Sequence, residues 1–186
     1  MQKTVIVLGC YRGGTSMVTA VLKSLGVFMG TRFGKESGGS NHEDLQFQGK
    51  NTETIRSMIK KRNEQNDVWG WKDPGLIFRI GEIEDDLRNP HFITIFRDPY
   101  AIALSEFHRN HRPLMEGLKT ALGHTQALVM FHERTMNPNH LISYEKAMND
   151  KATFVKNLVD FLGLDVSAKA MADAEEVMTY GGYTQA

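Results

Sequence analysis

A strand, a glycine-containing turn and a helix are predicted at the start of the chain, over residues 3–25 (KTVIVLGCYRGGTSMVTAVLKSL). The apolar, largely β-branched run VIVL ends at Gly9, which is typical of a strand buried on both faces of a parallel sheet. From Met17 onward, apolar residues recur every three or four positions and predict an amphipathic helix. Gly13 and Gly14 lie between the two elements. Because a helix N-terminus presents unpaired amides and glycine lets an anion approach the backbone, this turn is predicted to bind phosphate or sulfate.

The spacing of the turn is close to that of nucleoside-triphosphate-binding loops, G-x4-G-K-[ST]. Gly9 and Gly14 occupy the two glycine positions, but Thr15 stands in place of the lysine that contacts the β- and γ-phosphates. The only cation in the turn is Arg12. A kinase or nucleoside triphosphatase is therefore kept as an alternative, and an ordinary strand–helix turn without a ligand is a second one.

The length and charge of the chain limit the classes of protein to be considered. A chain of 186 residues with 41% hydrophobic side chains suits one well-buried core, so residues 1–186 are predicted to form a single domain. Its 22 basic and 22 acidic residues give no net charge, which argues against a nucleic-acid partner and requires any anion site to be local. The seven histidines form neither H-E-x-x-H nor a cluster with the cysteine, so no metal site is predicted.

The cysteine count and the apolar runs indicate a compartment. Cys10 is the only cysteine, so no intrachain disulfide can form. No apolar run approaches the roughly 20 residues that span a bilayer, and the N-terminal run is short for a signal peptide. We therefore expect a cytoplasmic protein without a transmembrane segment. The thiol of Cys10 is either packed or, through the positive potential of the turn, lowered in pKa.

Helices and strands are predicted to alternate along the rest of the chain. A long loop is expected first, because residues 26–41 carry five glycines and show no clear period. The patterns that follow predict a helix at 42–63, a strand at 68–74, a helix at 76–87, a strand at 91–96, helices at 100–111 and 113–136, and a strand at 140–145 leading into a helix. This alternation predicts a three-layer α/β fold with a central, mostly parallel sheet.

A second cationic motif follows the predicted strand at 91–96. Arg97 stands where a metal-dependent enzyme of the P-loop type is expected to carry an aspartate for Mg²⁺. Ser105 comes eight residues later, about two turns into the next helix, and could reach the same anion. Arg109 follows on the same helical face, where it would add charge or pair with a nearby carboxylate.

A cation and a carboxylate also end the aromatic strand at 68–74. Lys72 and Asp73 precede a proline, and in an open parallel sheet the carboxyl ends of the strands form the ligand-binding edge. The alternative is a solvated turn. Polar residues after the glycine-rich loop are further candidates for chemistry, although Glu43 and its neighbours would equally suit the first turn of a helix, where carboxylates complement the dipole.

Two of these motifs resemble those of the sulfotransferase family. The segment RGGTS fits the family's phosphosulfate loop, [KR]-[SG]-G-T-[ST], at every position, with Arg12, Gly13, Gly14, Thr15 and Ser16. The pattern of Arg97, Asp98 and Pro99 after a strand, with Ser105 eight residues on, is similar to the family's 3′-phosphate motif. Weaker similarity lies in the stretches WKDP (71–74), LISYE (141–145) and FLGL (161–164). The resemblance ends near Asp165, and no RKGxxGDWK-like stretch follows.

The resemblance implies a P-loop NTPase-like sulfotransferase fold and the donor 3′-phosphoadenosine 5′-phosphosulfate (PAPS), with PAP as product. Arg12 and residues 13–16 would hold the 5′-phosphosulfate, and Arg97 with Ser105 the 3′-phosphate. Lys72 would stabilise the bridging oxygen, and Arg12 is a catalytic candidate as well. The acceptor would be a hydroxyl or amine of a small molecule, a glycan or a lipid.

The general base is assigned by the same resemblance. Sulfotransferases similar to this chain often carry a glutamate or histidine after the first helix and its loop, which makes Glu43 the first candidate and His42 the second. Asp44 and Asp73 come next. The sequence leaves three functions open: a metal-independent sulfotransferase, a P-loop kinase or nucleoside triphosphatase, and a nucleotide-binding module without catalysis.

Overall fold

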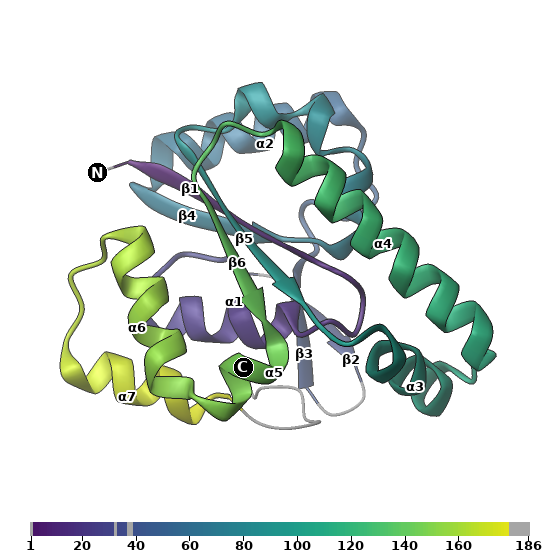
Figure 1. Ribbon diagram of the computed structural model, residues 1–186. Coiled ribbons are helices and arrows are strands. Elements are labelled where there is room, and N and C mark those ends of the chain that lie inside the picture. The colour runs from purple at the N-terminus through teal and green to yellow at the C-terminus, as the bar shows by residue number, and fades with distance from the viewer. Residues whose placement is uncertain (1, 32, 37–38, 179–186) are drawn as a thin grey trace.

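Four parallel strands form the central sheet of the protein, seen in a computed structural model that describes residues 2–31, 33–36 and 39–178 (Figure 1). In spatial order they are β4 (Val68–Lys72), β1 (Lys3–Gly9), β5 (Pro90–Phe96) and β6 (Asn139–Ser143). The pairs β1–β4, β1–β5 and β5–β6 are all parallel. The carboxyl ends of the four strands therefore meet at one edge of the sheet.

Helices cover both faces of this sheet and enclose two cores (Figure 1). One face packs against α1 (Thr15–Ser24), α5 (Tyr144–Asn149), α6 (Lys151–Leu162) and α7 (Ala168–Glu176). The other packs against α2 (Thr52–Gln65) and α4 (Leu114–Arg134), and α3 (Pro99–Asn110) lies beside α4. Successive residues of β1 point to opposite faces, so Val5 lies in the first core and Ile6 in the second. The predicted three-layer α/β architecture is confirmed.

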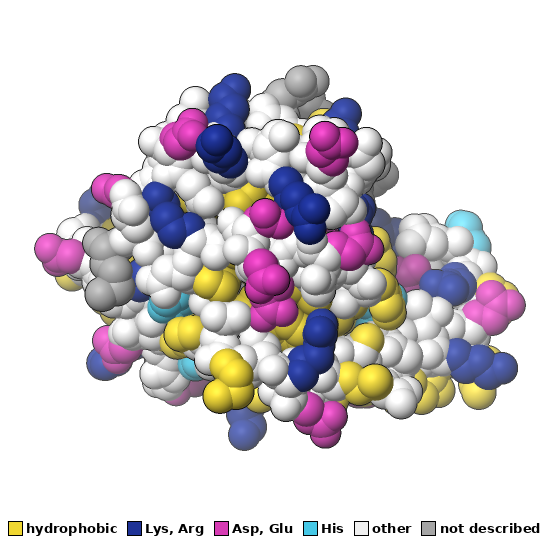
Figure 2. All heavy atoms as spheres, turned by 90° about the horizontal axis from the view of Figure 1, so that it is seen from above, with side chains coloured by type: hydrophobic (Ala, Val, Ile, Leu, Met, Phe, Trp, Pro, Cys, Tyr) yellow, Lys and Arg dark blue, Asp and Glu magenta, His cyan; other side chains and the backbone are white. Residues whose placement is uncertain are grey.

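Most of the predicted elements lie where the periodicity places them. The strands at 68–74, 91–96 and 140–145 correspond to β4, β5 and β6, and the helices at 100–111 and 113–136 correspond to α3 and α4. Residues 179–186, the end of the tail that lacks a third cofactor-binding stretch, lie outside the described residues. On the face shown in Figure 2, acidic and basic side chains are intermixed, in keeping with the absence of net charge.

The predicted helix at 76–87 is wrong. Three short 3-10 turns occupy this region: η1 (Pro74–Phe78), η2 (Ile80–Glu82) and η3 (Glu84–Asp86). Arg79 and Ile83 separate them with φ near −135°, outside the helical range. The apolar residues still lie on the inner side, because Leu76, Ile80 and Ile83 are buried in the second core. Their spacing is close to helical, and burial is achieved here without a continuous helix.

The predicted loop at 26–41 and the helix start at His42 are also wrong. The chain instead forms an antiparallel hairpin of β2 (Phe33–Glu36) and β3 (Gly39–Asp44). Helix α2 begins later, after Asn51, whose side chain accepts a hydrogen bond of 2.9 Å from the amide of Thr54. His42, Glu43 and Asp44 are therefore strand residues. The interpretation of Glu43 as a partner of a helix dipole does not hold.

Candidate active site

The turn after β1 forms a cradle of backbone groups at the carboxyl edge of the sheet. The amide of Gly13 donates to the carbonyl of Cys10 at 2.9 Å and closes the turn. Arg12 and Gly14 have φ of 62° and 98°, and this left-handed backbone is easiest for glycine. Helix α1 starts immediately afterwards, and Gly14 at its N-cap offers no side chain to bond the first amides. These amides are the donors that an oxyanion can accept from.

Replacing Gly14 by alanine should destabilise the protein. A Cβ atom there would lie 2.5 Å from Cδ2 of Tyr144, and φ of 98° strains any L side chain. We expect a loss of about 1–3 kcal/mol in the free energy of unfolding, measured by urea denaturation. Gly123→Ala is the matched control, because Gly123 lies in α4 with open space around it and alanine should add about 0.5–1 kcal/mol. Equal stability of Gly14→Ala and the wild type would contradict this account of the turn.

Arg97 and Ser105, from the second motif, both contact Arg12. Nη1 of Arg97 donates to the carbonyl oxygen of Arg12 at 2.7 Å, and Nε of Arg12 donates to Oγ of Ser105 at 3.1 Å. The guanidinium of Arg97 also lies over the ring of Tyr144, 4.5 Å from its centre. Two motifs that are about 85 residues apart in sequence thus meet at the turn.

Local capping orients the helix that carries Ser105. The side chain of Asp98 accepts a hydrogen bond of 2.9 Å from the amide of Tyr100, and Pro99 occupies the first turn of α3 as the sequence predicts. Oε1 of Glu145 accepts a hydrogen bond from the amide of Asp98 at 3.0 Å. The start of α3 is therefore held against α5, next to Arg97.

Glu43 and Lys72 form an ion pair at the same edge of the sheet. Nζ of Lys72 lies 2.9 Å from Oε1 of Glu43, and Gln48 donates to Oε2 of Glu43 at 2.8 Å. Lys72 ends β4 in register with Val7 of β1, two residues before the end of that strand. The side chain of Lys72 is 3% exposed and that of Glu43 is 15% exposed. A cation and a carboxylate are thus held, partly shielded from water, beside the anion cradle.

The neighbours of Glu43 are buried away from this pair. Asp44 is 3% exposed and forms an ion pair of 2.6 Å with Arg62 of α2, whose guanidinium also lies over the ring of Phe28. This buried pair fixes β3 against α2. His42 is 1% exposed, with its ring 5.7 Å from that of Phe33. Glu43 is the candidate base with a direct contact to a strand-end cation.

Tyr11 was not selected from the sequence, although it directly precedes Arg12. Burial raises the pKa of Tyr11, and the negative charges of Asp73 and Glu43 raise it further. Burial likewise raises the pKa of Asp73, with a further contribution from the charge of Glu43, while the amide of Gly75 donates to its side chain at 2.8 Å. The side chain of Tyr11 therefore lies close to both carboxylates. Its position in the cradle is the signal that could have identified it.

Cys10 is a packed residue rather than a reactive one. Its side chain is 4% exposed, and burial, assisted by the charge of Glu106, raises the pKa of the thiol to about 12. Of the two alternatives for this thiol, packing holds, because the loss of hydration outweighs the opposing effect of Arg112 on its pKa. Its burial and its raised pKa both make the thiol poorly suited to act as a nucleophile.

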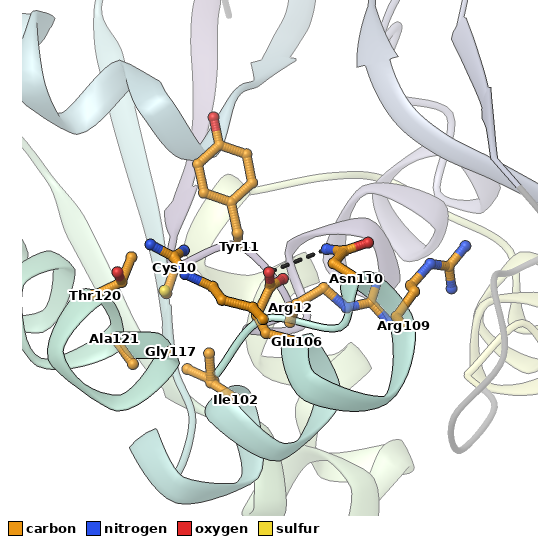
Figure 3. Close-up of a pocket in the computed structure, with 11 residues that line it drawn as sticks. Cys10, Tyr11, Arg12, Ile102, Glu106, Arg109, Asn110, Gly117, Thr120 and Ala121 are labelled. Atoms are coloured by element: carbon orange, nitrogen blue, oxygen red, sulfur yellow. Dashed lines mark hydrogen bonds between the residues drawn. The ribbon is translucent and has the colours of Figure 1, made fainter. Parts of the chain in front are cut away.

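A pocket of about 220 Å³ lies beside the turn, between α3 and α4 (Figure 3). It is lined by Cys10, Tyr11, Arg12, Ile102, Glu106, Arg109, Asn110, Arg112, Gly117, Thr120 and Ala121. The ring of Tyr11 extends from the turn (Figure 3) and lies 5.7 Å from the ring of His124 in α4. The pocket therefore adjoins the anion cradle, and Tyr11 relates it to the nearby carboxylates Asp73 and Glu43.

The described residues offer neither a metal-binding cluster nor a membrane-spanning helix. Within residues 2–31, 33–36 and 39–178, no three His, Cys, Asp or Glu side chains are grouped so that they could hold a metal ion. None of the helices described here combines the length and the apolar character needed to cross a bilayer. The cations at the site are side chains: Arg12, Lys72 and Arg97.

Comparison with known proteins relates the whole arrangement to one family. A sequence model described as the sulfotransferase family matches residues 36–168, more than half of the chain. No curated protein sequence matches the chain. Three solved structures illustrate the similarity in fold. They are the sulfotransferase domain from the curacin biosynthetic pathway, the sulfotransferase domain of the Synechococcus PCC 7002 olefin synthase, and a mouse sulfotransferase complexed with PAP.

The extent of the similarity is close to constant among the three. The curacin domain gives a TM-score of 0.62 at 14% identity, with 100% of this chain and 80% of that domain covered. The olefin synthase domain gives 0.66 at 14%, covering 97% and 78%. The mouse enzyme gives 0.62 at 15%, covering 96% of this chain and 64% of that enzyme. At identities this low, the structural similarity demonstrates a shared fold alone.

Proposed function

Because the chain belongs to the sulfotransferase family, we propose that it transfers a sulfuryl group from PAPS to a hydroxyl or amine of a small-molecule acceptor, without a metal ion. The observation that carries this proposal is the contact of Arg97 and Ser105 with Arg12. PAPS carries a phosphate on the 3′ oxygen of its ribose and a phosphosulfate on the 5′ oxygen, so it needs two cationic sites that lie close together. The PAP in the mouse structure supports the same nucleotide here.

The residues at the cradle suit such a donor. Nε of Arg97 is buried and makes no hydrogen bond among the described residues, so a bound anion would satisfy it. Arg97 and Ser105 would hold the 3′-phosphate. Arg12 would hold the 5′-phosphosulfate together with the amides of Gly13, Gly14, Thr15 and Ser16, at the uncapped start of α1.

The chemistry requires one proton transfer and one displacement. The acceptor oxygen or nitrogen forms a bond to sulfur while the bond from sulfur to the phosphate oxygen breaks, and PAP leaves with that electron pair. We assign Glu43 to accept the proton of the acceptor and Lys72 to stabilise the charge that develops on the leaving oxygen. Arg12 contributes positive charge at the same centre. By analogy with phosphoryl transfer, positioning and electrostatics supply most of the rate.

The transfer should survive removal of divalent metals. Arg97 occupies the strand-end position at which a metal-dependent P-loop NTPase carries an aspartate for Mg²⁺. Thr15 occupies the position of the lysine in the P-loop of such an enzyme. We therefore expect EDTA to leave the rate of sulfate transfer from radiolabelled PAPS unchanged. PAP should raise the Tm of the protein when EDTA is present. The acceptor is found by screening alcohols, sugars, phenols and amines.

Three outcomes separate the candidate functions. Stabilisation by PAP with transfer in EDTA supports the sulfotransferase. Activity lost in EDTA and restored by Mg²⁺, with stabilisation by ATP, would favour the kinase or nucleoside triphosphatase. Stabilisation by PAP without transfer to any acceptor class would favour a nucleotide-binding module. The ion pair of Glu43 and Lys72 favours catalysis over the module, because binding alone needs no base.

A further inference from the structure

The pocket beside the turn carries an excess of positive charge. Three arginines line it, Arg12, Arg109 and Arg112, against a single carboxylate, that of Glu106. This carboxylate is already engaged, since the side-chain amide of Asn110 donates to its Oε2 at 3.0 Å (Figure 3). The walls therefore suit a negatively charged ligand.

The floor of the pocket is apolar and closely packed. Cys10, Ile102 and Ala121 form a small hydrophobic cluster of their own, and all three are buried. At Gly117, α4 approaches α3 so closely that a Cβ atom would lie 3.1 Å from Cα of Ala103. A bound ligand would consequently make its polar contacts with the arginines and the polar side chains next to them. At about 220 Å³ the pocket is smaller than the range of roughly 300–1,000 Å³ common for ligand sites, so its ligand is small.

Among the three arginines of the pocket, Arg112 differs in its contacts within the described residues. Its guanidinium makes no ion pair and no hydrogen bond to any residue in the described ranges, although it is partly buried. It lies near the floor, because its charge partly opposes the effects of burial and Glu106 on the pKa of Cys10. Arginine binds carboxylates and phosphates through two parallel hydrogen bonds, so a partly buried one in a pocket is suited to such a group.

The pocket is connected to the reaction centre by two residues. Arg12 lines the pocket and bonds Ser105 of the second motif. Tyr11 also lines it, and this side chain lies within the electrostatic influence of Asp73 and Glu43. A molecule bound in the pocket would thus contact Arg12 of the donor cradle and Tyr11, whose side chain is under the influence of the assigned base.

We infer that the acceptor is a small molecule that carries an anionic oxygen group, a carboxylate or phosphate, and that Arg112 binds this group with Arg109 beside it. The inference rests on the proposed function. The oxyanion is separate from the hydroxyl or amine that receives the sulfuryl group, which must face Glu43. Arg112 therefore determines which acceptors bind and takes no part in holding the donor.

The experiment compares anionic molecules with neutral analogues in the presence of saturating PAP. The probe pairs are lactate with lactamide, hydroxyphenylacetate with hydroxyphenylacetamide, and glycerol phosphate with glycerol, all at one ionic strength. The anionic member of at least one pair should raise the Tm of the wild type above its neutral partner. Arg112→Gln should abolish this difference, whereas Lys119→Gln, which removes an exposed cation of α4, should retain it.

Transfer kinetics give a second readout. For an anionic acceptor, Arg112→Gln should raise KM by about tenfold or more, with kcat little changed and PAP affinity retained. Arg112→Lys, which keeps the charge, should recover part of the loss and shows that the site still folds. No preference of the wild type for any anionic probe would overturn the inference. So would a loss of PAP affinity in Arg112→Gln as large as that in Arg97→Ala, since the pocket would then belong to the donor. A wild type that PAP does not stabilise would instead contradict the proposed function.

Discussion

Replacing Arg97 by alanine should weaken PAP binding by about 2–4 kcal/mol, a factor of roughly 30 to 1,000, in isothermal titration calorimetry. The substitution removes the cation assigned to the 3′-phosphate. It also removes the hydrogen bond of 2.7 Å to the carbonyl of Arg12, which holds the turn beside Ser105. Both ends of the donor site are affected, which is why the expected loss is large.

Adenosine 5′-phosphosulfate, which lacks the 3′-phosphate, separates these two contributions. It should bind poorly to the wild type, and Arg97→Ala should weaken it much less than it weakens PAP. A similar loss for both nucleotides would mean that Arg97 acts mainly by shaping the turn. Equal affinity of the wild type for PAPS and adenosine 5′-phosphosulfate would contradict the assignment of the 3′-phosphate to this arginine.

Glu43→Gln should reduce sulfate transfer by at least about a hundredfold while leaving PAP affinity within a few-fold. Glutamine keeps the size of the side chain, and its carbonyl oxygen can still accept a hydrogen bond from Lys72. It cannot take the proton that the acceptor loses when the new bond to sulfur forms. Single-turnover transfer from radiolabelled PAPS measures the chemical step without product release.

Variants of neighbouring residues test the assignment of the base. His42→Ala should keep more activity than Glu43→Gln, because His42 is buried beside Phe33. The reverse order would exchange the two roles. If both variants transfer at the full rate, Asp73 is the next candidate. Asp44 is the weakest of the four, since Arg62 already holds it in a buried ion pair.

The parts of the fold that the sequence predicts well depend on local patterns. The strand, turn and helix of residues 3–25 follow from a β-branched run, paired glycines and a helical period, each of which acts over a few residues. The same holds for β5 with Arg97 and for α3 with its capping residues Asp98 and Pro99. Candidates for an anion site could therefore be named from spacing alone.

The contacts between candidates could not be predicted in the same way. Glu43 and Lys72 were both selected, but their ion pair depends on a hairpin that the sequence pattern assigned to a loop and a helix. The five glycines of this segment prevented a prediction of β2 and β3, because glycine is uncommon in strands and contributes nothing to a pattern of alternating apolar residues. Similarly, the bond from Arg12 to Ser105 depends on how α3 packs against the turn.

The pocket was also beyond sequence reasoning. The sequence pattern places Arg109 on the face of Ser105 and gives no signal for Arg112, because the pocket exists only where α4 returns beside α3. The failure at residues 76–87 has a related cause. Tertiary burial of Leu76, Ile80 and Ile83 is satisfied by successive 3-10 turns, and an apolar spacing close to helical does not distinguish these from a helix.

The position of β1 has a consequence for the entropy of donor binding. This strand lies between β4 and β5, and all seven of its residues are buried, so its amides should exchange with solvent only through large-scale opening. The anion turn continues from the strand and is closed by the bond from Gly13 to Cys10. Its shape thus exists before the nucleotide arrives. Little backbone freedom remains to be lost on binding, and more of the attraction between phosphate and protein is expressed as affinity.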